Sequence, residues 1–528
     1  MGAAATPTAP AATPLGSARV SVTDPRLRAV ALMIRAQTRE YAGWHDLDGT
    51  IQDLSPEGVA AGLAAVGTGE LPDDPVDAAI LQVTERSTRV AYGELALHRT
   101  NPYVHLANLD VASYDREYAP APEREAARAR HLAAWPDAVD MAVRSLDAVP
   151  APAAQALLPS VRGLAASVSD EKAQAAVARL VAHLEHFATD GDPDPALGEQ
   201  RLLAGYNASE ALDLDVTELT DLAASETSRL RAMLAEACDR LRPGEPVEDV
   251  VRDLVADGPT TADDVYAAAR TTTEEVRAFA TSSGLLPDLG GDVLVGPAPP
   301  SRRFAQAMMS WAAPYETDAP SRYYIVPPDE SWPVEQQREW LSVFSPTTLP
   351  TICVHEVTPG HFTHGRALRT LDSPIRRTLH SGAFVEGWAH HVEEVYAELG
   401  FRAEDPRYVI GVCLEALLRA TRLAVSVGLH TRAITVADAE EMFIRDAHMQ
   451  RAAAHGEAMR GTVDAFYGIY TLGKVALRRA RERARAAWGP AYDEKRFCLA
   501  LLALGAPPVG VVEAALLDPG SLPALWQN

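Results

Sequence analysis

The residues best suited to chemistry lie in two short stretches of the chain. His355, Glu356 and His361 belong to the stretch V-H-E-V-T-P-G-H, and Glu386 opens the later stretch E-G-W-A. Imidazole nitrogens and a carboxylate suit Zn²⁺, and a catalytic zinc site uses three protein ligands and leaves a fourth position for water. A second carboxylate beside the first histidine could accept a proton from that water. These residue types therefore predict a zinc-dependent hydrolase.

The spacing of the two histidines departs from the familiar pattern H-E-x-x-H, in which both imidazoles share one helical face. Here Pro359 occupies position i+4 from His355, and His361 arrives at i+6, about 120° around an ideal helix. Pro359 has no N–H for the carbonyl of His355, and Gly360 tolerates backbone angles closed to other residues. We therefore predict a helix that kinks or widens at Pro359-Gly360 and returns His361 to the metal.

The combination H-E-x-x-P-G-H and E-G-W-A resembles the bacterial family known as domain of unknown function 885, which is grouped with the helical gluzincin metallopeptidases. The resemblance covers most of the chain after the N-terminal tail. It implies metal ligands at His355, His361 and Glu386, with Glu356 as general base. It also draws attention to the late Y-x-x-G match, in which the hydroxyl of Tyr470 could stabilise an oxyanion.

A helix predicted from about Ser381 to Leu399 offers further candidates. Glu386, His390 and Glu393 lie at i, i+4 and i+7, so they share one helical face. His390 or Glu393 could orient a metal ligand through a hydrogen bond. Alternatively, His390 could itself replace Glu386 as a ligand.

Other residues near the motifs receive less specific interpretations. His391 and Glu394 point away from the shared face, and we expect them to be solvated. His364 is expected to line the site. Tyr467, a helical turn from the oxyanion candidate, and Tyr323 are either substrate contacts or buried packing residues.

The rest of the sequence predicts helix after helix, and with the resemblance it predicts a mainly α, zincin-like metallopeptidase fold with a deep cleft. Residues 284–326 are the exception, because their β-branched and aromatic content indicates a small β element beside the motif helix. A free strand edge there could bind extended substrate, or the element could be purely structural. We expect a disordered tail over 1–16 and one folded unit over 17–528, with 17–283 as a helical wall and 284–528 carrying the metal site.

Composition narrows the classes of partner. The 528 residues include 48 Lys or Arg and 72 Asp or Glu, a net charge of −24. This charge opposes binding to nucleic acid or to an anionic membrane. No apolar run of 18 or more residues is present, so no membrane span is expected. The four cysteines show no paired metal-ligand spacing and suggest buried thiols in a reducing compartment, so we expect a cytoplasmic protein.

The predicted substrate is a peptide or a small amide-containing molecule. Two alternatives stay open: a metal-dependent tailoring enzyme that acts on one small metabolite, and an inactive scaffold of the same fold. Zinc is the expected metal, one ion per chain, although another divalent ion is compatible with the same ligands.

Overall fold

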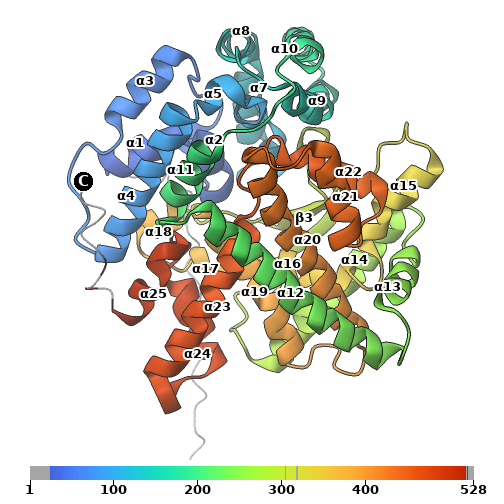
Figure 1. The fold of residues 1–528 in the computed structure, drawn as a ribbon. Coiled ribbons are helices and arrows are strands. Elements are labelled where there is room, and N and C mark those ends of the chain that lie inside the picture. The colour runs from blue at the N-terminus through green and yellow to red at the C-terminus, as the bar shows by residue number, and fades with distance from the viewer. Residues whose placement is uncertain (1–23, 304, 317–318, 519, 521, 523–528) are drawn as a thin grey trace, which may run out of the picture.

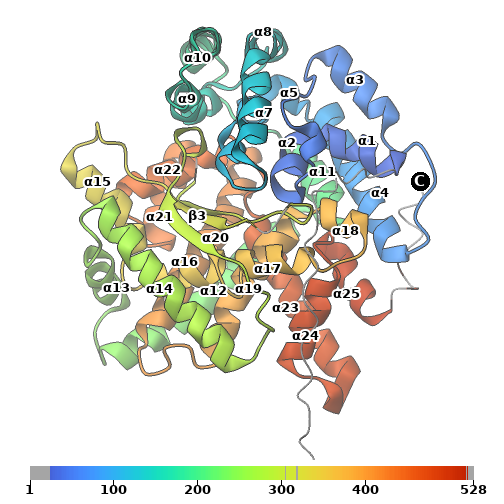
Figure 2. The same cartoon turned by 180° about the vertical axis from the view of Figure 1, so that it is seen from behind.

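The computed structural model describes residues 24–303, 305–316, 319–518, 520 and 522. Helices make up most of this chain, and three short strands form one small sheet near the centre (Figures 1 and 2). The predictions of a mainly α fold and of a small β element are therefore confirmed. The tail predicted over residues 1–16 lies outside the described residues.

The first half of the chain is helical throughout. Its α-helices are α1 (Pro25–Met33), α2 (Arg35–Gln37), α3 (Pro56–Ala65), α4 (Pro75–Arg89), α5 (Leu97–Thr100), α6 (Pro102–Leu109), α7 (Ala121–Ala133), α8 (Trp135–Ser145), α9 (Ala151–Ala166), α10 (Glu171–Asp190), α11 (Glu199–Glu210), α12 (Val216–Leu241), α13 (Val247–Ala256) and α14 (Ala262–Ser283). Two short π-helical segments, η1 (Thr38–Ala42) and η3 (Val90–Glu94), extend this set.

The second half begins with the strands β1 (Val293–Pro297), β2 (Ala307–Ser310) and β3 (Ser321–Ile325). Its helices are α15 (Val334–Leu341), α16 (Leu349–Glu356), α17 (His361–Leu368), α18 (Pro374–Thr378), α19 (Gly382–Glu398), α20 (Arg407–His430), α21 (Val436–Asp446), α22 (Arg451–Gly461), α23 (Ile469–Trp488), α24 (Glu494–Ala503) and α25 (Val509–Leu517). No helix in the described part of the chain is long and apolar enough to be a membrane span.

Local sequence signals fix several helix starts. The side chain of Asp74 accepts hydrogen bonds from the N–H groups of Val76 and Asp77, and Pro75 occupies the first turn of α4. Ser381 accepts a hydrogen bond from the N–H of Phe384 at the start of α19. Both are N-cap arrangements, which satisfy N–H groups that the helix itself leaves free.

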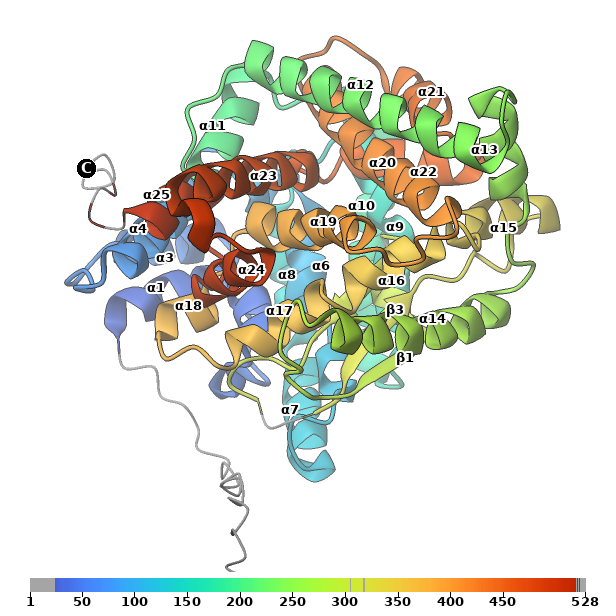
Figure 3. The same ribbon diagram turned by 90° about the horizontal axis from the view of Figure 1, so that it is seen from below.

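Long helices from both halves pack side by side around the motif helix α16. In Figure 3, α12 lies along α20 and α19 lies along α23, and these pairs have extensive contacts. Helix α14 packs against α16 and β1. Helices α12 to α14 thus share a core with residues 284–528, and packing is continuous across the boundary predicted at residue 283.

The small sheet has the order β1-β3-β2, with β3 parallel to β1 and antiparallel to β2. Strand β2 lies on one side of β3 and contacts α16. The predicted position of the β element beside the motif helix is therefore confirmed, and the edge strand β2 is the part that adjoins it.

Buried ion pairs join the first half of the chain to the segment around β2. Arg302 lies 2.9 Å from Glu40 and 2.6 Å from Asp110, and Arg116 lies 2.6 Å from Glu316. Each pair links a residue before position 120 to one after position 300. Breaking such a pair would leave an uncompensated buried charge, which is strongly destabilising.

A second connection runs through Glu210, at the end of α11. One carboxylate oxygen accepts hydrogen bonds from the hydroxyl of Ser381, at 2.6 Å, and from the N–H of Val509, at 3.2 Å; the other accepts from the N–H of Ala383 at 3.4 Å. Glu210 is 2% exposed. Burial raises its pKa to about 7, and these hydrogen bonds offset only part of that rise.

We predict that Glu210→Gln gains stability relative to the wild type as pH rises. Between about pH 4.5 and pH 7 the unfolded chain releases the proton that folded Glu210 retains, so wild-type stability falls over this range. A glutamine removes this loss, which amounts to at most about 3 kcal/mol. Thermal unfolding midpoints at about pH 5 and pH 8 would measure it, with the half-exposed Glu185→Gln on α10 as a matched control. Equal midpoint differences at both pH values would contradict the prediction.

Candidate metal centre

The motif helix is interrupted between the two histidines. Helix α16 ends at Glu356 and α17 begins at His361, so the turn 357–360 replaces the predicted kink within one helix. The N–H of Gly360 donates to the carbonyl of Val354 at 3.2 Å. A Cβ at Gly360 would collide with the carbonyl oxygen of His355. The glycine is needed here for this close approach, because a side chain would occupy the place of that carbonyl oxygen.

The turn is also anchored to the helix that carries the third ligand. The indole Nε1 of Trp388, on α19, donates to the carbonyl oxygen of Pro359 at 2.9 Å. Trp388 is fully buried. The tryptophan of E-G-W-A therefore fixes the turn between the histidines relative to α19.

The glycines of E-G-W-A and Y-x-x-G meet where α19 crosses α23. A Cβ at Gly387 would lie 2.5 Å from the carbonyl carbon of Gly473, and a Cβ at Gly473 would collide with the carbonyl oxygen of Ala383. The two helices can approach this closely only because both residues lack a side chain. This contact sets the distance between Glu386, just before one glycine, and Tyr470, three residues before the other.

His355, His361 and Glu386 come together as the sequence predicted. Oε2 of Glu386 lies 3.3 Å from Nε2 of His355 and 3.4 Å from Nε2 of His361. One ligand atom from each residue falls within 4.8 Å of the others. The imidazole rings meet nearly at right angles, with centroids 4.6 Å apart. Ligand atoms at this spacing surround a space where one metal ion could bind all three.

Several polar atoms at this place lack a hydrogen bond. Within the described residues, the buried Oε2 atoms of Glu386 and Glu356 have no hydrogen-bond partner, and neither does Nδ1 of His361. Buried carboxylate oxygens are seldom left unsatisfied, because their desolvation costs free energy. A divalent cation would satisfy the Glu386 oxygen, so the residues present fit a metal of the zinc type.

A buried chain of hydrogen bonds orients His355. Its Nδ1 lies 2.8 Å from Oε1 of Glu393, and Oε2 of the same carboxylate accepts a hydrogen bond from Nη1 of Arg419 at 3.0 Å. A carboxylate can only accept, so Nδ1 carries a proton, and Nε2 is the ring nitrogen that faces Glu386. Burial alone would raise the pKa of Glu393, but Arg419 and the histidines His390 and His355 hold it well below its usual range.

The pKa values of the two carboxyl groups at the centre, Glu386 and Glu356, are shifted in opposite directions. Burial raises the pKa of Glu386, but the neighbouring His361 and His355 outweigh burial and bring it well below its usual value. For Glu356, burial dominates, and its pKa rises to about 7 despite the opposing effect of His361. Glu386 is therefore ionised as a ligand should be, whereas Glu356 titrates near neutral pH. A general base works best with such a pKa.

Tyr470 lies beside this centre. Its ring is 6.4 Å from the His355 ring, nearly parallel to it, and the guanidinium carbon of Arg422 lies 4.9 Å from the Tyr470 centroid. Nη2 of Arg460 donates to its hydroxyl oxygen at 3.4 Å. Burial and Glu386 raise the pKa of Tyr470, and the two arginines lower it. The structure thus brings Tyr470 to the ligands.

The remaining candidates lie outside the ligand cluster. His390 is buried, with Nδ1 3.1 Å from Glu393, and it does not belong to the three-residue cluster, so the arrangement gives no support to its replacing Glu386. Nε2 of His364 donates to the carbonyl of Gly505 at 3.0 Å. His364 is thus a fully buried residue that ties α17 to the loop before α25.

Both remaining tyrosines belong to the apolar core. Tyr323, on the central strand, is fully buried, and its hydroxyl lies 3.9 Å from Sγ of Cys353, behind the motif helix. Tyr467 is fully buried in the cluster formed with α20 to α22, and its hydroxyl has no hydrogen-bond partner among the described residues. The packing interpretation therefore describes both.

The expectation that His391 and Glu394 are solvated is wrong. His391 is 3% exposed. Glu394 forms ion pairs with Lys474 and with Arg229, the latter at 2.6 Å. The face of α19 opposite the candidate ligands is covered by α23, and Arg229 of α12 reaches Glu394 there, so this helix is buried on both sides.

Sequence analysis missed Arg419, Arg422 and Arg460. The first two lie on α20, which the sequence otherwise marks as an apolar core helix. Charged residues on such a helix are rarely buried unless they are paired. Arginines within an otherwise apolar helix were therefore a signal in the sequence that buried carboxylate partners exist. Trp311 was also missed; its ring lies 6.3 Å from His361 and 5.3 Å from Tyr41.

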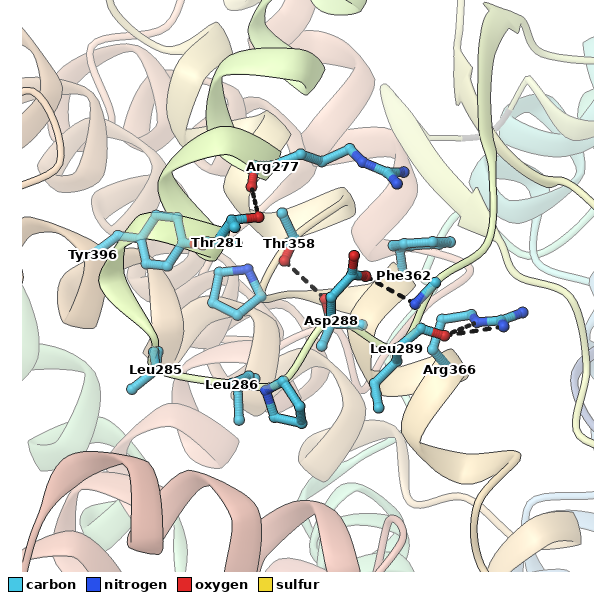
Figure 4. Close-up of a pocket in the computed structure, with 15 residues that line it drawn as sticks. Arg277, Thr281, Leu285, Leu286, Asp288, Leu289, Thr358, Phe362, Arg366 and Tyr396 are labelled. Atoms are coloured by element: carbon cyan, nitrogen blue, oxygen red, sulfur yellow. Dashed lines mark hydrogen bonds between the residues drawn. The ribbon is translucent and has the colours of Figure 1, made fainter. Parts of the chain in front are cut away.

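A pocket of about 70 Å³ is lined in part by the turn between the histidines (Figure 4). Thr358, Pro359 and Phe362 line it, but none of the cluster residues does. Arg277 donates to the carbonyl of Gly291, and Arg366 donates to that of Leu289. These hydrogen bonds fix the position of the loop before β1. The deep cleft implied by the resemblance remains a prediction.

We predict that Glu393→Gln weakens zinc binding. The amide keeps the shape of the side chain but loses the charge that holds His355 in its tautomer. Loss of such a partner typically lowers metal affinity by about 10- to 100-fold. Competition with a chromophoric chelator would measure the affinity, with Glu457→Gln as a control for loss of a buried carboxylate that pairs with Arg422 instead. Unchanged zinc affinity in Glu393→Gln would contradict this role.

Comparison with known proteins bears on the fold and the family. Two solved structures are similar over nearly their whole length: a "putative lipoprotein of unknown function" from Shewanella oneidensis (18% identity, 93% of this chain and 98% of that chain, TM-score 0.71) and a "putative lipoprotein" from Colwellia psychrerythraea (16%, 94% and 99%, TM-score 0.69). None of the curated proteins compared with the chain matches it. The family described as "Bacterial protein of unknown function (DUF885)" matches residues 37–516, and this chain belongs to that family.

Proposed function

We propose that this protein is a zinc-dependent hydrolase that cleaves peptide or amide bonds. The observation that carries the proposal is the cluster of His355, His361 and Glu386, whose ligand atoms lie within 4.8 Å of one another. Glu356, with a buried oxygen that has no hydrogen-bond partner among the described residues, adjoins the first ligand. Two imidazoles and a carboxylate form a ligand set typical of catalytic zinc.

Each residue has a task in this proposal. His355, His361 and Glu386 hold the ion, and Glu393 fixes the tautomer of His355. A bound zinc ion supplies a Lewis acid that brings the pKa of a coordinated water towards neutrality. Glu356 accepts a proton and delivers it to the leaving amine, which its pKa of about 7 favours. The hydroxyl of Tyr470 donates a hydrogen bond to the developing oxyanion.

The proposed partners follow from charge and chemistry. The net charge of −24 disfavours nucleic acid and anionic membranes, so the substrate we propose is a peptide or a small amide. The four cysteines are all buried and free, which supports a reducing compartment such as the cytoplasm. Proteins described as lipoproteins share the fold, so attachment at a cell surface is the alternative location.

The proposal predicts one zinc ion per chain. Elemental analysis of the purified wild type should find it, and His361→Ala and Glu386→Ala should each lose most of it, because two ligands hold zinc far more weakly than three. His364→Ala is a matched control, since this neighbouring histidine lies outside the cluster. A wild type that contains no zinc and cannot be reconstituted with it would rule out the proposed centre.

The proposal also predicts separate effects on binding and catalysis for Glu356→Gln. This variant should bind zinc normally, because Glu356 is not one of the ligands, and should lose about 100-fold or more in kcat, the usual contribution of a general base. Hydrolysis of a mixed peptide library, followed by mass spectrometry, would measure it. Full hydrolytic activity in the zinc-loaded variant would show that another group accepts the proton.

A further inference from the structure

Arg460, in the last turn of α22, lies next to the proposed oxyanion-binding residue. Its guanidinium carbon is 5.8 Å from the ring centroid of Tyr470, and Nη2 donates to the Tyr470 hydroxyl at 3.4 Å. Tyr470 in turn lies beside the metal ligand His355. A positive charge is therefore only one side chain away from the ligand cluster.

Two other arginines near the centre already have firm partners. Arg419 lies 3.0 Å from Glu393, which orients His355. Arg422 forms two hydrogen bonds of 2.7 Å with the buried carboxylate of Glu457. Both guanidinium groups are at most 7% exposed. Their charges are neutralised within the core, so neither is available to a ligand.

Arg460 is held less firmly. Its Nε and Nη2 face Asp464 at 3.3 and 3.0 Å, and the side chain of Asp464 is 41% exposed. Within the described part of the chain, Nη1 makes no hydrogen bond. The Arg460 side chain is itself 15% exposed, but water and salt reach the carboxylate of Asp464 and weaken the pair. Arg460 can therefore offer donors to an incoming carboxylate at small cost.

Residues from the first half of the chain lie in the same region. Tyr41, on η1, is 38% exposed, and its ring lies 5.3 Å from Trp311, which adjoins the ligand His361. Burial dominates the raised pKa of Tyr41, and both Tyr103 and Glu386 add to it. Burial also raises the pKa of Tyr103, and Arg460 partly opposes that rise. Tyr41 and Tyr103, both from the first half of the chain, thus interact electrostatically with Glu386 and Arg460 respectively.

We propose that Arg460 binds the free carboxylate of the substrate, so that the centre removes an amino acid or a similar amide-linked acid from a C-terminus. This inference rests on the proposed function. In an amide-linked amino acid, three bonds separate the scissile carbonyl carbon from the carboxylate carbon, so the two carbons are less than about 4 Å apart. The groups that bind them must be neighbours, as Tyr470 and Arg460 are.

The net charge of the protein supports a role for Arg460 in binding an anionic substrate. With a net charge of −24, the overall field repels an anionic substrate. Recognition of a carboxylate then needs a local donor, and the planar guanidinium of arginine matches carboxylate geometry with two parallel hydrogen bonds.

Binding of a matched ligand pair tests the inference. Zinc-loaded Glu356→Gln protein, chosen so that the ligand persists, is titrated with N-acetyl-alanyl-alanine and with its C-terminal amide by calorimetry. We expect the free acid to bind at least about tenfold more tightly than the amide, the contribution of a charge-assisted hydrogen bond. Adding Arg460→Gln should abolish this preference, whereas Arg460→Lys should retain part of it.

Arg451→Gln, at the start of the same helix with a side chain 60% exposed, is the matched control and should keep the preference. Equal affinity for acid and amide, binding of neither, or an equal loss of both in Arg460→Gln would overturn the inference; the last result would leave Arg460 only positioning Tyr470. Hydrolysis of the same pair by the wild type separates the two proposals. Acid-selective binding that depends on Arg460, without hydrolysis, would support carboxylate recognition and contradict the proposed reaction.

Discussion

The second half of the chain depends on the burial of several carboxylates within one helical core. Glu356, Glu386 and Glu393 are largely removed from water, and an effective penalty of several kcal/mol accompanies each buried charge without a partner. Glu393 meets this requirement through His355 and Arg419. Oxygens of Glu386 and Glu356 have no hydrogen bond among the described residues. A divalent cation is the partner that would complete the arrangement.

The need of buried charges for partners also explains the arrangement of the arginines around the site. Arginines on α20 lie on the side of the core that faces the site, each with a carboxylate at hydrogen-bond distance. Arg460, at the end of α22, has instead a half-exposed partner, and its Nη1 makes no hydrogen bond among the described residues. In the proposed centre, buried pairs hold the candidate ligands in place, and the more loosely paired guanidinium of Arg460 is the one left for recognition. The difference in burial separates structural charges from the one we assign to substrate.

Close helix packing fixes the relative positions of the candidate ligands and Tyr470, which ion pairs alone would not fix. Gly387 and Gly473 let α19 and α23 touch, Gly360 lets the turn approach the carbonyl of His355, and Trp388 holds that turn from α19. These contacts place residues from three separate helices around one point. A side chain at any of these glycines would move a ligand or Tyr470 away from the others, because packed interiors have no spare volume.

The sequence by itself determined the helical class, the small β element, the candidates His355, His361 and Glu386 that the structure brings together, and the need for a break at Pro359-Gly360, because residue type, spacing and backbone restriction are local properties. It did not determine that the break separates two helices, that His391 is buried, or that Tyr467 belongs to the core, because burial depends on which helices pack together. The tertiary structure alone brought Arg460 beside Tyr470 and Tyr41 towards the same region. Such contacts join segments far apart in the chain, and no local pattern records them.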